Sequence, residues 1–189
     1  MRQLTEEETR TLFSKLAHYT GRSLNNLIAP PTTAEGPAGE QHVFRLQGSR
    51  VFYMPLKLAN LSVSIPRENL LSMGTMIGKF TKTGKFRLAL TCLDVISPHA
   101  RYKVWIKSNG VMPYLYGGNV LKAHVHRWSE DLPEHAGVLV FDDNDNCLGF
   151  GVTSRSSAEA KKLDPTGIVV FRQADVGEYL REEDSLFTT

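Results

Sequence analysis

Residues 138–153 read VLVFDDNDNCLGFGVT, and this stretch decides the fold of the C-terminal half of the chain. Two apolar runs, Val138–Phe141 and Leu148–Val152, flank five polar turn-forming residues, which is the pattern of a β-hairpin. Runs this short and this rich in Val and Phe are typical of strands in a small barrel or sandwich. Gly149 and Gly151 lie on one face of the second strand, so we expect a tight bend or the close approach of a backbone or ligand there.

The segments on either side extend the barrel pattern. A third apolar run, Ile168–Phe171, follows a break that contains Pro and Gly, and LYGGNVLK occupies residues 115–122. Taken together, the segments YGGNVLK, LGFGVTS and VVFRQADVGEYLR resemble a PUA domain, which is a small RNA-binding pseudo-barrel. The resemblance implies that the C-terminal half folds as such a barrel and performs no chemistry of its own.

Three further motifs extend the resemblance to nearly all 189 residues. They are TEEETR at residues 5–10, GKFTKTGKFRL at residues 78–88 and YKVWIK at residues 102–107. With these motifs the whole chain resembles the Nip-seven family, which comprises assembly factors of the large ribosomal subunit in eukaryotes.

The N-terminal half carries signals for helices and for an antiparallel sheet. Thr5 and Glu8 form a capping box, and Gly21 can end the amphipathic helix that follows. The remaining expected elements are a helix at Ser23–Ile28, a hairpin of His42–Gln47 and Arg50–Met54, helices at Leu56–Val63 and Arg67–Leu71, and strands at Thr75–Phe80 and Lys85–Leu93. Residues 29–39, with three prolines and two glycines, are expected to form a mobile surface loop.

These signals predict an α+β chain of two domains. Residues 1–95 are expected to form an N-terminal α/β domain with helices packed on an antiparallel sheet, residues 96–181 a PUA pseudo-β-barrel, and residues 182–189 an acidic tail. The boundary is placed at Ser-Pro-His-Ala, residues 97–100, because this segment interrupts the periodic pattern. A strand at Tyr102–Lys107 then opens the second domain.

The bulk composition narrows the class of protein. With 41% hydrophobic and 22% charged residues, the chain reads as an ordinary soluble globular protein. Cys92 and Cys147 stand far apart without a partner motif, which indicates reduced thiols in an intracellular compartment. The polar, acidic start predicts no signal peptide, and no apolar run approaches the roughly 20 residues that span a membrane.

Charge is distributed unevenly along the chain. Between Lys79 and Lys107 there are seven Lys or Arg residues and one acid, Asp94, so the local balance is +6 against +2 for the whole chain. A protein that neutralises phosphates needs such a cluster. The alternative is that Lys and Arg keep an exposed hairpin soluble, and the sequence leaves these two interpretations open.

The PUA resemblance implies a second basic set around the first glycine turn and after LGFGVTS. The candidate RNA-binding residues of this set are Lys122, His124, Arg127, Arg155, Lys161 and Lys162. Those of the first domain are Lys79, Lys82, Lys85 and Arg87. Trp105, Tyr114, Tyr116 and Trp128 lie near basic residues and could stack on bases, although packing in the core is the commoner role of such side chains.

No motif predicts catalysis, a metal or a cofactor. Asp142, Asn144 and Asn146 imitate the start of an EF-hand loop, but position six is Cys147 and position twelve is Thr153. GKFTKTGK departs from the P-loop order, and His124 and His126 have no zinc-type partners. Asp175 is interpreted as a structural carboxylate. We therefore expect no catalytic residues, no metal ligands and no cofactor.

The family resemblance implies a non-enzymatic factor of the nucleus and nucleolus, present also in the cytoplasm, that binds pre-rRNA of the large subunit. The implied protein partners are nucleolar pre-60S assembly proteins and a component of the RNA exosome, and the chain is expected to be a monomer without membrane contact. Two other functions stay open at this point. The chain could be mainly a protein scaffold in pre-60S particles with weak RNA contact, or it could be an RNA-modifying enzyme.

Overall fold

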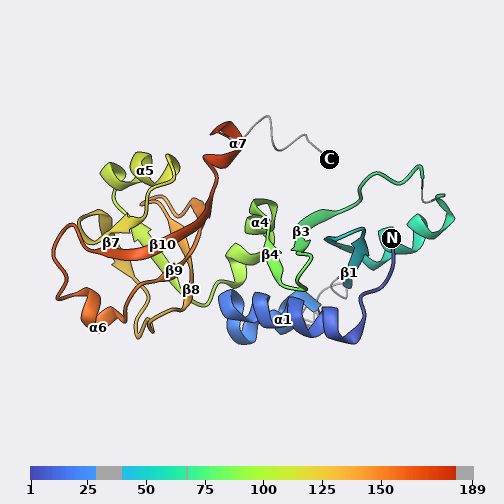
Figure 1. The fold of residues 1–189 in the computed structure, drawn as a ribbon, viewed down its shortest axis with the longest axis horizontal. Helices are drawn as coiled ribbons and strands as arrows, with labels where there is room; N and C mark the ends of the chain where they lie inside the picture. The colour runs from blue at the N-terminus through green and yellow to red at the C-terminus, as the bar shows by residue number, and fades with distance from the viewer. Residues whose placement is uncertain (29–39, 67, 182–189) are drawn as a thin grey trace, which may run out of the picture. The chain divides into compact units, whose positions relative to one another are not determined.

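The computed structural model describes residues 1–28, 40–66 and 68–181. The chain divides into two compact units, Met1–His99 and Ala100–Thr189, and each is described here by itself (Figure 1). The expected loop at residues 29–39, the first residue of the expected helix at Arg67 and the expected acidic tail at residues 182–189 lie outside the described residues.

The first unit combines short helices with an antiparallel sheet of strand order β1-β2-β3-β4. Its elements are α1 (Glu6–Thr20), η1 (Gly21–Ser23), α2 (Leu24–Ile28), β1 (His42–Gln47), β2 (Arg50–Pro55), α3 (Leu56–Leu61), η2 (Ser62–Ser64), β3 (Thr75–Phe80), β4 (Phe86–Leu88), η3 (Leu90–Cys92), α4 (Leu93–Ile96) and η4 (Ser97–His99). Segments labelled η are short 3-10 helices.

Helix α1 begins as its sequence predicts. The Glu8 amide donates to Thr5 Oγ1 at 3.3 Å, and the Thr5 amide donates to Glu8 Oε2 at 2.8 Å, which together make the capping box. Leu12, Leu16 and Tyr19 are buried on one side of the helix and form part of the core of this unit. The predicted capping box and amphipathic helix are therefore confirmed.

Two elements predicted for the first unit are wrong. The expected helix at Arg67–Leu71 is a turn over its described part, in which the Asn69 amide donates to the Pro66 carbonyl at 3.0 Å. The Leu70 carbonyl accepts from Gln47 Nε2 at 2.5 Å, so a side chain of β1 replaces the helical ladder. The expected strand at Lys85–Leu93 keeps only Phe86–Leu88, because the chain then turns into η3.

The second unit is a six-stranded sheet of order β6-β10-β9-β8-β5-β7. Its elements are β5 (Lys103–Ile106), α5 (Ser108–Leu115), β6 (Val120–Leu121), η5 (Lys122–His124), β7 (Val125–Trp128), β8 (Gly137–Phe141), β9 (Cys147–Thr153), α6 (Ser157–Ala160), β10 (Ile168–Asp175) and α7 (Glu178–Arg181). The two edge strands, β6 and β7, are joined by the three residues of η5 alone, so the edges lie close together and the sheet curls into a nearly closed barrel. The predicted PUA-type pseudo-barrel is confirmed.

The hairpin predicted for residues 138–152 is also present. Strands β8 and β9 pair antiparallel with Val138 opposite Gly151 and Val140 opposite Gly149. A Cβ atom added to Gly149 would lie 2.3 Å from the carbonyl oxygen of Ala174 on β10 and 2.7 Å from the hydroxyl of Tyr114. The close approach predicted for this glycine is thus made by the neighbouring backbone and by a side chain of α5.

Candidate nucleic-acid interface

A groove of about 330 Å³ on the second unit collects several of the predicted residues. It is lined by Lys122, Val125, His126, Arg127 and Trp128, which follow one another through η5 and β7. Lys122 and Arg127, singled out from sequence as separate candidates, therefore lie on one surface. His126 shares the groove, but its Nδ1 lies 2.7 Å from Asp143 Oδ1.

Lys122 joins this groove to the turn after α6. Its Nζ donates to the backbone carbonyl of Lys161 at 2.7 Å and also to that of Leu163. Part of the hydrogen-bonding capacity of the ammonium group is thus used inside the protein. Lys161 and Lys162 are exposed, and neither has a carboxylate oxygen within 4.0 Å in the described part of the chain. The Lys122 ammonium thus lies against the backbone that carries Lys161 and Lys162, and we call these three lysines the α6 cluster.

Arg127 is partly committed to its neighbours. Its guanidinium carbon lies 4.1 Å from the centre of the Trp105 ring, and its Nη2 lies 3.4 Å from Asp145 Oδ1. Trp105 Nε1 donates to the same carboxylate oxygen at 2.5 Å. One face of Trp105 is therefore occupied by a cation, so base stacking on that face would require Arg127 to move.

The remaining candidates of the second unit lie outside the groove. His124 is half-buried, and its Cβ faces Gly110 of α5. Arg155 lies 4.0 Å from Glu159 one helical turn away, and both side chains are 54% exposed. An exposed ion pair of this kind contributes little to stability and leaves the guanidinium accessible.

Asp175 has a different environment from all of these. It is fully buried and accepts hydrogen bonds from Arg172 Nη1 at 2.5 Å and from two nitrogens of Arg181 at 3.0 and 2.9 Å. Burial acts to lower the pKa of Arg172, but its hydrogen bonds with Asp175 and Glu178 outweigh this and raise it. The carboxylate is closed off from any reactant by these partners, in keeping with the structural role that the sequence suggested.

The first unit places its predicted cations on the sheet. Lys79 stands directly opposite Arg87 on β4 and also directly opposite Arg50 on β2. Directly opposed residues point to the same face, so Arg50, Lys79 and Arg87 form a basic row across three strands. All three are exposed. Like charges in such register destabilise a sheet, and a bound anion would relieve the repulsion. Arg50 escaped the sequence argument because strand register cannot be read from local composition.

Lys82 and Lys85 belong to the turn between β3 and β4. The Thr81 amide donates to the Lys85 carbonyl at 2.8 Å, which closes the turn, and both lysines are exposed. The basic run from Lys79 to Lys107 is therefore divided in the structure. Its first four cations lie in the first unit, whereas Arg101, Lys103 and Lys107 lie in the second.

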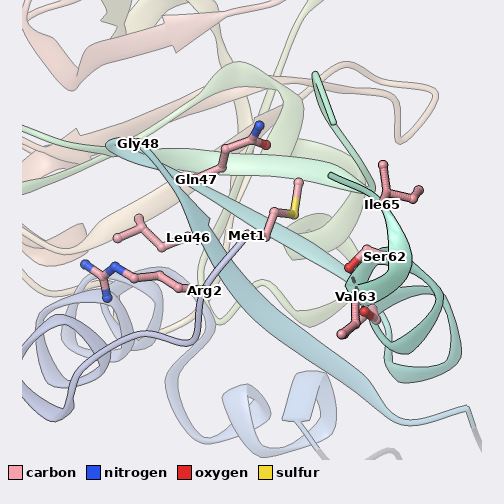
Figure 2. Close-up of a pocket in the computed structure, with 9 residues that line it drawn as sticks. Met1, Arg2, Leu46, Gln47, Gly48, Ser62, Val63 and Ile65 are labelled. Atoms are coloured by element: carbon pink, nitrogen blue, oxygen red, sulfur yellow. Dashed lines mark hydrogen bonds between the residues drawn. The ribbon is translucent and has the colours of Figure 1, made fainter. Parts of the chain in front are cut away.

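A second hollow in the first unit has a different character. It holds about 410 Å³ beside β1, and Figure 2 shows Met1 between the strand that carries Gln47 and the segment that carries Ser62 and Ile65. Its one Lys or Arg side chain, Arg2, is bound to Glu8 at 2.6 Å. The hollow therefore lacks the unpaired Lys and Arg side chains of the basic surfaces described above.

The described residues contain no metal-binding cluster and no membrane-spanning helix. No three His, Cys, Asp or Glu side chains there come close enough together to hold a metal ion. Asp142 instead accepts from the amides of Asn144 and Asn146 at 2.8 Å, which shapes the β8–β9 turn. No helix within these ranges has the length and apolar character needed to cross a membrane.

Comparison with known proteins agrees with both halves of the fold. Residues 1–90 match the family described as NIP7/UPF0113, pre-PUA domain, and residues 102–184 match the UPF0113 PUA domain. The 60S ribosome subunit biogenesis protein NIP7 of Saccharomyces cerevisiae is 58% identical over 188 residues, with 100% of each chain covered. The protein of the same name in Schizosaccharomyces pombe is 54% identical, with 99% of this chain and 100% of that protein covered. Neither relative carries the name of an enzyme.

Solved structures support the fold alone. A PUA domain from Aeropyrum pernix K1, determined as a tartrate complex, superposes with a TM-score of 0.58 at 16% identity and covers 97% of this chain and 90% of its own. A conserved PUA domain protein from Thermoplasma acidophilum gives a TM-score of 0.56 at 12% identity, with coverage of 96% and 97%.

Proposed function

Because the chain belongs to the NIP7 family of 60S ribosome subunit biogenesis proteins, we propose that it is a non-enzymatic RNA-binding factor needed for pre-rRNA processing and large-subunit assembly. Its RNA ligand in this proposal is pre-rRNA of the large subunit. Its protein partners are nucleolar pre-60S assembly proteins and a component of the RNA exosome. It acts as a monomer in the nucleus and nucleolus and is present also in the cytoplasm.

The observation that carries the RNA part is the α6 cluster beside the Lys122–Arg127 groove. Two of its three lysines are exposed without a carboxylate partner in the described residues, and the third is fixed in place by backbone carbonyls. Lys122 would lose little side-chain freedom on meeting a phosphate, because part of its ordering has already occurred on folding, while Lys161 and Lys162 present their charges to solvent. In this mechanism the backbone phosphates of RNA lie across the groove, and no bond is made or broken.

The test is a comparison of salt dependence. Lys161→Gln/Lys162→Gln should weaken binding of a labelled oligouridylate, and the plot of log Kobs against log salt should become shallower by about 1.4, since each lost single-strand phosphate contact removes about 0.7. Lys161→Arg/Lys162→Arg keeps both charges and should keep the slope. An unchanged slope in the Gln variant would refute the assignment of these lysines. Crosslinking in cells followed by sequencing would then identify the pre-rRNA segment.

A second candidate function, protein docking, rests on one specific observation. Leu61, Val63 and Leu71 of the first unit are 68%, 84% and 87% exposed, and one residue separates Leu61 from Val63 in the chain. Exposed apolar side chains that form a patch mark interaction sites. In this reading an apolar segment of a pre-60S assembly protein covers them. Leu61→Ser/Val63→Ser should then release the protein from pre-60S particles in a sucrose gradient, while its affinity for oligouridylate stays the same.

The third possibility, an RNA-modifying enzyme, has a direct test. Liquid chromatography with mass spectrometry of nucleosides from RNA incubated with the purified full chain should show no nucleoside of changed mass or changed retention time. A change in either that depends on the protein would contradict the non-enzymatic assignment.

A further inference from the structure

Helix α1 and the turn before β4 enclose a groove that none of the sequence motifs singled out. The groove holds about 590 Å³, and four of its lining residues are basic: Arg10, Lys15 and His18 from α1, and Lys85 from the turn. None of its lining residues is acidic. Helix α1 packs beside β4 in this unit, which is how residues some 70 positions apart come to share one surface (Figure 1).

The cations of this groove lack counter-charges. Within residues 1–28, 40–66 and 68–181, no carboxylate oxygen lies within 4.0 Å of Arg10, Lys15 or Lys85. In the same helix, by contrast, Glu8 is bound to Arg2. An unpaired group of like charges attracts anions more strongly than the same charges in ion pairs, since nothing cancels its field.

Lys15 is the least hydrated of the four. Its side chain is half-buried, and burial lowers its pKa. Burial together with the charge of Lys15 also lowers the pKa of His18. The Lys15 ammonium lies 5.7 Å from the centre of the Tyr19 ring, a contact that offsets only part of the lost hydration. A phosphate oxygen in the groove would supply the missing partner.

The arrangement fits a chain of anions better than a single one. Arg10 and His18 are eight residues apart on α1, which corresponds to about 12 Å along the helix axis. One phosphate group reaches only part of this length, whereas successive phosphates of a strand reach all of it. A strand would therefore run along α1 between Arg10 and His18.

We propose that this α1 groove is a second binding site for single-stranded RNA, in which Arg10, Lys15, His18 and Lys85 contact consecutive backbone phosphates. The inference rests on the proposed function of RNA binding but concerns residues in the other unit. It extends the RNA path of the first unit beyond the Lys79–Arg87 hairpin and onto helix α1. Arg10, Lys15 and His18 were not predicted as RNA contacts, because in the sequence of α1 only the apolar face forms a pattern.

The experiment uses the full chain and labelled oligouridylate. Lys15→Gln/Lys85→Gln is compared with the charge-preserving Lys15→Arg/Lys85→Arg, and each pair is also placed in the Lys161→Gln/Lys162→Gln background. Lys57→Gln serves as a control for the loss of one exposed charge elsewhere in the first unit, because its side chain is 87% exposed. The Gln pair should make the log–log salt slope shallower by about 1.4 in both backgrounds, so the gain in affinity from 1 M to 0.1 M salt shrinks about 25-fold. Circular dichroism verifies that each variant is folded.

The outcomes separate the two proposals. If Lys161→Gln/Lys162→Gln lowers the slope and the groove pair does not, the α1 site is wrong while the proposed function stands. If only the groove pair lowers the slope, the α1 site stands and the α6 cluster is wrong. If the full chain fails to bind oligouridylate at low salt, both are wrong. A polyglutamate peptide serves as the rival anion, and if it displaces the RNA from the groove at equal charge concentration, the groove binds acidic peptides and the RNA assignment is overturned.

Discussion

Replacing Asp175 by Asn should destabilise the second unit without weakening RNA binding. The carboxylate is fully buried and accepts three hydrogen bonds from Arg172 and Arg181. Asn presents one acceptor oxygen and carries no charge, so it leaves two guanidinium groups with unmet partners. Breaking a buried ion pair by removing one member costs about 3–5 kcal/mol, because the remaining charge stays desolvated.

The geometry places this substitution at the lower end of that range. The side chains of Arg172 and Arg181 keep 24% and 26% exposure, so water can hydrate them in part. Arg172 also keeps Glu178 at 2.7 Å. We therefore expect Asp175→Asn to lower the free energy of unfolding by about 3 kcal/mol, a factor of about 150 in the folded-to-unfolded ratio.

Urea unfolding followed by tryptophan fluorescence measures this effect selectively, because both tryptophans, Trp105 and Trp128, lie in the second unit. Glu178→Gln is the matched control. It removes one acceptor of Arg172 and leaves the buried Asp175 in place, so it should lower the free energy of unfolding by about 1 kcal/mol. Oligouridylate affinity of folded Asp175→Asn should stay within about twofold of the wild type. An unchanged unfolding midpoint together with a large loss of RNA affinity would show that Asp175 is a functional carboxylate and would refute the structural assignment.

Three further outcomes are expected. Gly149→Ala should destabilise the second unit by about 1–3 kcal/mol in urea because its Cβ would meet the neighbouring backbone, while Gly84→Ala, with φ +75 and open space around it, should cost only about 1 kcal/mol. Thr5→Ala should lower the stability of the first unit by about 1 kcal/mol, seen by far-UV circular dichroism, and an unchanged midpoint would exclude the capping box as a stabilising element. The hydrogen bond from Arg2 lowers the pKa of Glu8 to about 2. The contribution of ionised Glu8 to folding stability should therefore be complete above pH 4.5, the value of a free Glu, and disappear as the pH falls towards 2. The stability of Glu8→Gln should lack this dependence on pH. If the stability of the wild type changes with pH in parallel with that of Glu8→Gln, the assignment of this contribution to Glu8 is contradicted.

Local signals in the sequence predicted those parts of the fold that depend on neighbouring residues. The capping box at Thr5, the hairpin of β8 and β9 and the close approach at Gly149 all follow from residue types at short spacing. Helix α5 was not predicted, because Gly110 and Pro113 interrupt the helical pattern. Its Tyr114 is buried and donates to the Ala174 carbonyl at 3.3 Å, so tertiary packing overrides the weak local propensity.

The candidate interface could be predicted only in part, because its composition depends on register and packing between distant segments. Lys79 and Arg87 were found as basic residues, but the row that Arg50 completes exists only once β2, β3 and β4 are paired. The same holds for Lys85, whose neighbours in space are on α1. A one-residue change of register would place these side chains on the other face of the sheet, and composition carries no record of that choice.

Pairing with acids divides the cations of this chain into two groups with different roles. Arg2, Arg172 and Arg181 are bound to carboxylates within 3.0 Å, so they stabilise the fold and contribute little field outside it. Lys79, Arg87, Lys161, Lys162 and the α1 groove cations have no carboxylate within 4.0 Å in the described residues, and their positive potential remains available to a ligand. The formal net charge of +2 therefore does not measure the local attraction for RNA, which depends on the cations that have no acid beside them. Neutralising an unpaired lysine should thus change the salt slope of RNA binding with little loss of stability, whereas neutralising a paired arginine should do the reverse.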